Sequence, residues 1–196
     1  MKTGLYFGSF NPIHIGHLAI ANYMVENSDL DEIWFVVSPH NPLKKKSSLL
    51  ANHHRIRLAE LSTDNDDRLF VSDIETKMPQ PSYTIDALTW LNEKYPGKEF
   101  ALIMGGDNLI TLHKWKNADE LVRKYSLYVY PRKEKHGAYP PELEGLVKNA
   151  KIVIVKAPLM EISGTFIRDS IAAGKDVRHF LPAAVWKYID EMNFYK

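Results

Sequence analysis

The chain has 196 residues, of which 45% are hydrophobic and 25% are charged, so it can form one sizeable globular α/β domain. Its formal net charge of +1 gives no bulk field that would recruit nucleic acid or a membrane, so any basic site must be local. It contains no cysteine, which excludes disulfides, thiolate catalysis and zinc–thiolate sites. No apolar run approaches the roughly 18 residues of a membrane span. Because no signal-like stretch precedes the first predicted strand, we expect a cytoplasmic protein.

The first distinctive stretch runs from Gly8 to His17 and reads Gly-Ser-Phe-Asn-Pro-Ile-His-Ile-Gly-His. The apolar run 4–7 before it predicts a buried strand, and residues 18–25 predict a helix. A glycine-bearing turn at a helix N-terminus presents backbone N–H groups and a favourable dipole to phosphate. His14 and His17 lie three residues apart and can converge on one anion. The alternative is an ordinary turn with two solvated histidines.

This stretch resembles the HxGH signature of nucleotidyltransferases, which transfer AMP or CMP from a nucleoside triphosphate. A lone HxGH tetrapeptide is weak evidence, but here it follows Gly-Ser-Phe-Asn-Pro directly after the first strand. The resemblance implies that His14 and His17 donate to the α- and β-phosphates of the nucleotide. It also implies that Gly8, Ser9 and Phe10 lie against its adenine and ribose.

Residues 32–37 predict a second strand, apolar throughout as in a parallel sheet covered on both faces. The loop that follows carries Lys44, Lys45 and Lys46, which are either a solvated run or a phosphate clamp. The resembled family has a lysine in this loop, and we favour Lys45. Residues 53–61 predict a helix whose His54 and Arg55 either face the phosphates or lie on a solvated surface.

Residues 69–72 predict a third strand, and Pro79–Leu88 form the second informative stretch. There Ser82 or Thr84 can cap a helix that runs to about Tyr95. The segment resembles the mononucleotide-binding segment of pyridine-nucleotide adenylyltransferases, which implies that Tyr83 and Thr84 lie beside a pyridine ring.

Residues 99–104 predict a fourth strand that delivers Gly105 and Asp107 to the same sheet edge. Paired glycines allow a nucleotide to approach the backbone closely, and Asp107 can accept from a ribose hydroxyl or a magnesium-bound water. Trp115 stands between two lysines, which disfavours a wholly buried position. The resemblance implies that its indole stacks on the pyridine.

Residues 127–130 predict a fifth strand, followed by Arg132 near the mononucleotide and a surface excursion over 133–145. Residues 151–155 predict a sixth strand. Ser163 and Thr165 are natural N-cap residues for a helix that Gly174 ends, with Arg168 able to reach a phosphate. This run resembles the second family signature, Ser-x-Thr-x-x-Arg, with Gly164 where serine is commoner. A last amphipathic helix spans about 182–192, with Val185, Tyr188 and Ile189 packed inward.

These elements predict a Rossmann-like, doubly wound, mostly parallel sheet of about six strands, in one domain over 1–196 with a helical part from about 162 to 196. A GxGxxG fingerprint and a Walker A sequence are both absent, which disfavours dehydrogenases and P-loop kinases. The chain resembles the nicotinate-nucleotide adenylyltransferases, which implies ATP and nicotinate mononucleotide as substrates and Mg²⁺ as cofactor. In this interpretation His14, His17, Lys45 and Arg168 hold the phosphates. Gly105, Asp107, Ser163 and Thr165 complete the ATP site, and Mg²⁺ is held through the phosphates, with Asp107 contributing only through water.

Three alternatives stay open at this point. The acceptor could be nicotinamide mononucleotide, or the chain could be another adenylyl- or cytidylyltransferase such as phosphopantetheine adenylyltransferase. Phosphopantetheine adenylyltransferase carries Thr-x-Gly-His, whereas this chain has His14 in place of the threonine, which disfavours that alternative. A non-catalytic nucleotide-binding module is the distant alternative. The sequence leaves the oligomeric state open, a homo-oligomer included.

Overall fold

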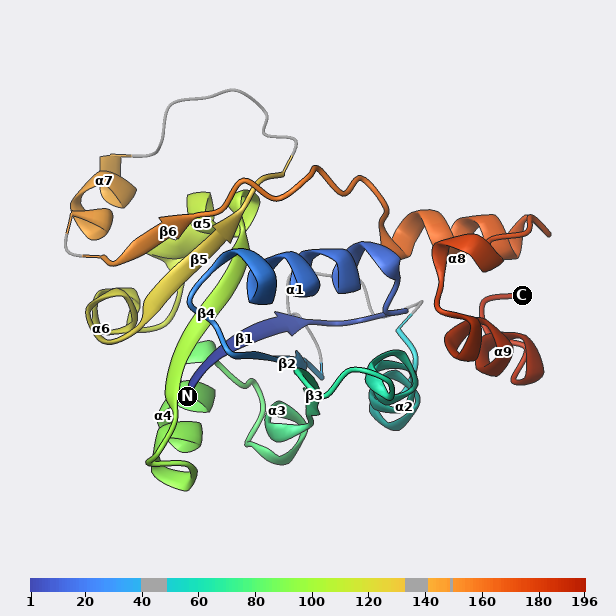
Figure 1. The fold of residues 1–196 in the computed structure, drawn as a ribbon, viewed down its shortest axis with the longest axis horizontal. Coiled ribbons are helices and arrows are strands. Elements are labelled where there is room, and N and C mark those ends of the chain that lie inside the picture. Colours follow the sequence, from blue (N-terminus) through green and yellow to red (C-terminus); the bar gives the residue numbers. More distant parts are fainter. Residues whose placement is uncertain (40–48, 133–140, 149) are drawn as a thin grey trace.

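Six parallel strands form one sheet in the order β3-β2-β1-β4-β5-β6 (Figure 1). We describe a computed structural model over residues 1–39, 49–132, 141–148 and 150–196. The strands are β1 (Lys2–Gly8), β2 (Glu32–Val37), β3 (Leu69–Ser72), β4 (Glu99–Gly105), β5 (Ser126–Tyr130) and β6 (Ile152–Ile154). The predicted Rossmann-like, doubly wound sheet is therefore confirmed, and the order reverses direction between β1 and β4.

Alternate residues along the strands pack into two separate hydrophobic cores, one on each face of the sheet. On β1, Tyr6 belongs to the first core and Leu5 to the second, and β4 alternates in the same way between Ile103 and Leu102. This is the period-two pattern of a sheet buried on both faces, which explains why the strands are apolar throughout.

The first core is covered by α1 (Ile15–Asn27), α2 (Asn52–Thr63), α8 (Gly164–Ala172), the short helix η3 (Arg178–Phe180) and α9 (Ala183–Glu191). The second is covered by α3 (Ile74–Lys77), α4 (Thr84–Lys94), α5 (Gly106–Thr111), η2 (Leu112–Lys114), α6 (Ala118–Lys124) and α7 (Pro141–Val147). In α9, Val185 and Ile189 are fully buried, as the sequence predicts. Helices α8 and α9 thus share one core with β1 rather than forming a core of their own.

The strand predictions are confirmed to within a few residues, but several helices were not predicted. Helices α3, α5 and α6 are only 4, 6 and 7 residues long, so each gives too few turns for a clear periodic pattern. The predicted surface excursion over 133–145 includes a helix in its described part, because α7 begins at Pro141. Proline at the first helical position needs no N–H partner, which makes it a helix start as well as a loop residue.

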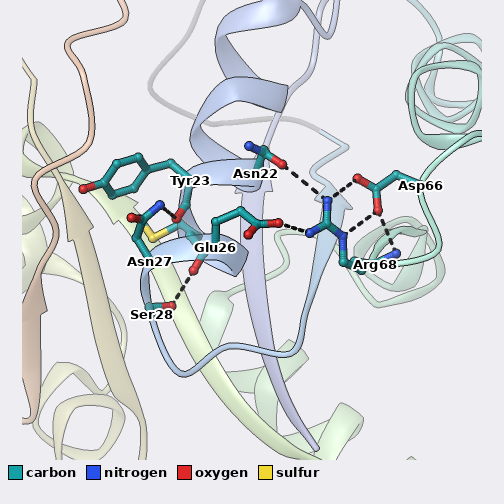
Figure 2. A network of polar contacts seen from close by, with 8 residues as sticks. Asn22, Tyr23, Glu26, Asn27, Ser28, Asp66 and Arg68 are labelled. Carbon is teal, nitrogen blue, oxygen red and sulfur yellow. Dashed lines mark hydrogen bonds and ion pairs between the residues drawn. The ribbon is translucent and has the colours of Figure 1, made fainter.

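Arg68 fixes the end of α1 that lies away from the histidines (Figure 2). Its guanidinium donates to Glu26 and Asn22 on α1 and to Asp66 in the turn before β3. Figure 2 shows these partners meeting at the Arg68 side chain from α1 and from the connection between α2 and β3. The network ties α1 to the β3 side of the sheet and so helps to set the direction in which α1 points its N-terminus.

Within the described ranges, no helix has both the length and the apolar character needed to cross a bilayer.

Candidate active site

The candidate site lies at the carboxyl ends of β1 and β4, where the strand order reverses. From β1 the chain crosses to β2 through α1, whereas from β4 it crosses to β5 through α5 and α6. Connections that diverge in this way leave a crevice at the carboxyl edge, and open α/β sheets bind ligands there. Gly8 ends β1 and Gly105 ends β4, so both predicted nucleotide-contacting glycines lie at this edge.

Residues 8–17, which we call the histidine loop, begin with an unusual turn at Phe10. The φ of Phe10 is +42°, in the left-handed region that a side chain rarely adopts. Its ring is only 2% exposed and packs edge-on against Tyr6 and Phe35. A Cβ on Gly8 would lie 2.8 Å from that ring, so only glycine fits beneath it. The ring of Phe10 therefore belongs to the core, so the prediction that the adenine and ribose lie against Phe10 concerns its backbone.

His14 and His17 form one rigid unit at the start of α1. The backbone N–H of His14, the N-cap residue, donates to Nδ1 of His17 at 3.2 Å. The two rings stack with centroids 3.7 Å apart, and Phe10 packs edge-on against His17 at 5.1 Å. Because Nδ1 of His17 accepts this bond, the proton of the neutral ring lies on Nε2, which is then a hydrogen-bond donor.

His14 is held in its neutral form. Its side chain is buried, and burial together with the positive charge of Arg132 lowers its pKa to about 4. Among the described residues, its Nδ1 has no hydrogen-bond partner. A buried polar nitrogen of this kind reduces stability and commonly marks a functional position.

Arg168 reaches the histidine loop from α8. Ser163 caps this helix by accepting from the N–H of Phe166 at 3.2 Å, which confirms it as the N-cap. Arg168 donates through Nη1 to the carbonyl of Asn11 at 2.6 Å and through Nη2 to Oγ1 of Thr165 at 3.3 Å. Thr165 is thus not a cap but a partner of the arginine. Both signature segments meet at this contact, although they lie 157 residues apart.

Gly164 permits this close approach. A Cβ at that position would lie 2.8 Å from the Asn11 carbonyl oxygen and 3.2 Å from Nη1 of Arg168. The α8 N-terminus and the histidine loop can therefore touch because this residue has no side chain.

Asp107 and Arg132 lie together at the end of β4 and β5. Nε of Arg132 is 3.9 Å from Oδ1 of Asp107, and Nη2 donates to the Tyr130 hydroxyl at 3.3 Å. Asp107 is exposed, so its carboxylate is available to a ribose or to a hydrated cation. The charge of Arg132 also acts on His14, which connects this pair to the histidine loop.

A model of the cytidylyltransferase-like family matches residues 5–170. A protein of Flavobacterium psychrophilum named "Probable nicotinate-nucleotide adenylyltransferase" is 54% identical over 196 residues, with all of both chains covered. A protein of the same name from Bacteroides thetaiotaomicron is 44% identical, over 97% of this chain and 92% of its own. The chain belongs to the nicotinate-nucleotide adenylyltransferase family. The expected family and nucleotidyltransferase class are confirmed.

Solved structures of the family share the fold. The nicotinic acid mononucleotide adenylyltransferase of Plasmodium falciparum, complexed with NaAD, superposes with a TM-score of 0.80 at 21% identity, covering 99% of this chain and 97% of its own. The same enzyme complexed with APC gives a TM-score of 0.77, covering 99% and 96%. At this identity the likeness concerns the fold alone.

Tyr83 and Trp115, the predicted acceptor residues, belong to elements that cover the opposite face of the sheet from α1 and α8. Trp115 is half-buried against the second core, and Tyr83 is 41% exposed at the start of α4. The prediction that Ser82 or Thr84 caps α4 is wrong: Tyr83 is the N-cap, and Thr84 is the first helical residue. Lys116 connects the two segments, because its Nζ lies 4.7 Å from the centre of the Tyr83 ring and 2.8 Å from Asp86 on α4.

Arg55 was placed wrongly by sequence reasoning. It is neither on a phosphate nor on a solvated surface but fully buried, where burial lowers its pKa to about 10 and leaves it charged at neutral pH. Its guanidinium donates to the carbonyls of Leu50, Ser9, Ser38 and Pro39 and to Oδ1 of Asn52. His54 does not face the phosphates either, since its Nδ1 lies 3.0 Å from the Tyr188 hydroxyl.

A signal for this role is present in the sequence of α2. Arg55, Leu58 and Ala59 follow the i, i+3, i+4 spacing of one helix face, and all three are buried. Lys116 and Tyr195, in contrast, show no such pattern. The predicted triphosphate lysine, Lys45, lies outside the described residues.

Proposed function

We propose that the protein transfers the adenylyl group of ATP to nicotinate mononucleotide and releases nicotinate adenine dinucleotide and pyrophosphate. The observation that carries this proposal is the stacked His14–His17 pair joined to Arg168 through Asn11, at the carboxyl end of β1. The names of the relatives and the NaAD complex of a structural neighbour support the same reaction. We further propose that it acts in the cytoplasm.

The reaction needs no nucleophile from the protein. A phosphate oxygen of the mononucleotide forms a bond to the α-phosphorus, and the bond from that phosphorus to the bridging oxygen breaks. The electron pair leaves with pyrophosphate. Catalysis then consists of holding the two phosphates in line and stabilising the charge that develops on the α-phosphate and the leaving group.

Each basic side chain has a defined task in this proposal. Nε2–H of His17 donates to the α-phosphate. Neutral His14 supports the His17 ring through the stacked contact and donates its own N–H to a β-phosphate oxygen. Arg168, oriented by Asn11, holds the β- and γ-phosphates together with Lys45. A preorganised donor of this kind needs no reorganisation when the charge develops.

Asp107 suits a hydrated magnesium ion. Its carboxylate is 64% exposed at the carboxyl edge, and Mg²⁺ usually binds through one or two carboxylates, waters and substrate phosphates. Among the described residues no group of three or more His, Asp or Glu side chains could hold a metal alone, so the phosphates would supply most ligands. Bound Mg²⁺ would neutralise part of the triphosphate charge.

The acceptor assignment rests on the start of α4. Tyr83 and Thr84 stand at a helix N-terminus, whose dipole favours an anion, and Lys116 adds a cation over the Tyr83 ring. A nicotinate carboxylate gains from both, whereas a nicotinamide amide gains less. Trp115, next to Lys116 in the chain, is available to stack on the pyridine.

A pyrophosphate-release assay tests the function. The protein is incubated with ATP and Mg²⁺ alone, then with nicotinate mononucleotide, nicotinamide mononucleotide or phosphopantetheine, and the series is repeated with CTP. We expect release only with ATP and a pyridine mononucleotide, with kcat/KM higher for the nicotinate form. Preference for the nicotinamide form would reverse the acceptor assignment. Absence of release with every pair would favour a non-catalytic nucleotide-binding module.

A further inference from the structure

The segment after α9 folds back onto the histidine loop. Asn193 and Tyr195 have φ values of +54° and +66°, which turn the chain sharply, and the N–H of Phe194 donates to the carbonyl of Ile189 at 3.0 Å. The turn brings the Tyr195 hydroxyl within 2.7 Å of Oδ1 of Asn11, 184 residues away in sequence. Residues at the two ends of the described chain are thus in direct contact.

Asn11 forms hydrogen bonds with three separate segments, through Tyr195, Leu50 and Arg168. Its Oδ1 accepts from the Tyr195 hydroxyl and from the N–H of Leu50, at 3.2 Å, so both acceptor directions of the amide oxygen are occupied. Its backbone carbonyl accepts from Nη1 of Arg168 at 2.6 Å. The side chain is therefore held in place, and its own backbone then orients the guanidinium.

The surroundings of Tyr195 suit a hydroxyl that stays protonated. Burial raises the pKa of Tyr195, while the nearby charges of Arg168 and Arg55 act in the opposite direction. Its hydroxyl thus lies near both arginines that contact the histidine loop, one from α8 and one from α2. A neutral phenol in this place is a hydrogen-bond donor to Asn11 at neutral pH.

We propose that Tyr195 is a positioning residue for the nucleotide: through Asn11 it fixes the histidine loop and the Arg168 guanidinium in the geometry that binds the triphosphate. This inference rests on the proposed function for its ligand, ATP. Tyr195 lies on the α8–α9 side of the sheet, whereas Trp115 packs on the other side, so we expect its effect to be confined to the nucleotide.

Tyr195→Phe removes only the hydroxyl, and Tyr188→Phe is its matched control. Tyr188 lies on α9, its hydroxyl bonds to His54 at 3.0 Å, and its ring packs on Phe194. Each variant loses one partly buried hydrogen bond, so both should lower the melting temperature by similar amounts. A merely structural role for Tyr195 would make the two variants alike in every other measurement.

The decisive measurement is the affinity for MgATP by calorimetry, together with steady-state kinetics. We expect Tyr195→Phe to weaken MgATP binding and raise the KM for ATP about 5- to 10-fold, the effect of one lost hydrogen bond. The KM for the mononucleotide should stay within about 2-fold, and Tyr188→Phe should match wild type in both. Equal MgATP affinities in wild type and Tyr195→Phe, or equal losses in both variants, would overturn the inference.

The binding measurement separates this inference from the proposed function. If wild type binds MgATP but transfers nothing to nicotinate mononucleotide, the acceptor assignment fails, while the comparison of Tyr195→Phe with Tyr188→Phe still decides the role of Tyr195. If wild type binds no MgATP, both proposals are wrong.

Discussion

The His14 backbone N–H donates to Nδ1 of His17 at 3.2 Å while the two rings stack at 3.7 Å. One histidine therefore sets both the protonated nitrogen and the plane of the other. A ring fixed on three sides, by His14, Phe10 and Tyr6, loses little rotamer freedom when a phosphate binds. The order of residues in HxGH acquires a physical meaning here, because the N-cap and the third helical residue are the pair that can make this contact.

Replacement of His17 by alanine should reduce turnover with little effect on folding. It removes a donor aimed at developing charge, and loss of one such donor typically lowers kcat about 10²- to 10³-fold. Initial rates of pyrophosphate release measure the effect, and a thermal melt checks the fold. Phe10 keeps its ring contacts with Tyr6 and Phe35 in this variant, so we expect the fold to persist. A variant with the melting temperature and the turnover of wild type would exclude His17 from the mechanism.

His14 should make folding stability depend on pH between about 6.5 and about 4. Its pKa is lowered in the folded state, so as the pH falls below 6.5 the unfolded chain takes up a proton that the folded chain does not. Stability is therefore fully present above the unfolded value and is lost on acidification, by about 1.4 kcal/mol per pH unit for one proton. Urea unfolding of wild type and His14→Asn at several pH values measures the difference.

We expect the gap in unfolding free energy between wild type and His14→Asn to change by up to about 3 kcal/mol across that window. His179→Asn is the control, since His179 is exposed in η3. Parallel pH profiles for wild type and His14→Asn would show that His14 is not held neutral.

Arg55→Lys should destabilise the protein much more than Arg57→Lys. Lysine keeps the charge of Arg55 but cannot reach several carbonyls with a planar fork, so buried acceptors lose their partners. The expected loss is about 2–4 kcal/mol. Arg57, on the same helix, is half-exposed and pairs with Glu60 at 3.4 Å, a contact worth at most about 0.5 kcal/mol. Denaturant midpoints of the two variants compare them directly, and similar midpoints would contradict the anchoring role.

Lys116→Met should weaken binding of the mononucleotide acceptor and leave the KM for ATP unchanged. Tyr83 and Asp86 hold the Lys116 ammonium in place. Loss of its charge beside the proposed nicotinate carboxylate should raise the KM for the mononucleotide about 5-fold, because an exposed ion pair contributes up to about 1 kcal/mol. Lys124→Met, which breaks the Glu120 ion pair on α6, is the matched control. A Lys116→Met enzyme whose KM rises for ATP instead would place Lys116 on the nucleotide side.

Local patterns predicted the sheet and the signature residues, because strand burial and helix capping leave periodic traces in the sequence. The apolar run 32–37 became β2 without change, and Ser163 caps α8 as expected. Gly174 ends that helix with a φ of +69°.

What the sequence could not supply were contacts made across the fold. Arg55 was expected near the surface or the phosphates because arginine is seldom buried, and its carbonyl partners come from three segments. The burial of the Phe10 ring could not be predicted, because its direction depends on a left-handed turn that a non-glycine residue rarely adopts. No local sequence pattern predicted the role of Tyr195, because its hydrogen-bond partner, Asn11, lies 184 residues away in the chain.

In the proposed assignments the two helical layers have different duties, with Asp107 on α5 as the exception. His17 and Arg168 belong to elements over one face of the sheet, whereas Tyr83 and Trp115 belong to elements over the other. Chemistry on the triphosphate and choice of acceptor can therefore diverge independently in evolution. An engineer could exchange the segment around α4 and η2 to admit a different acceptor and leave the catalytic half of the molecule intact.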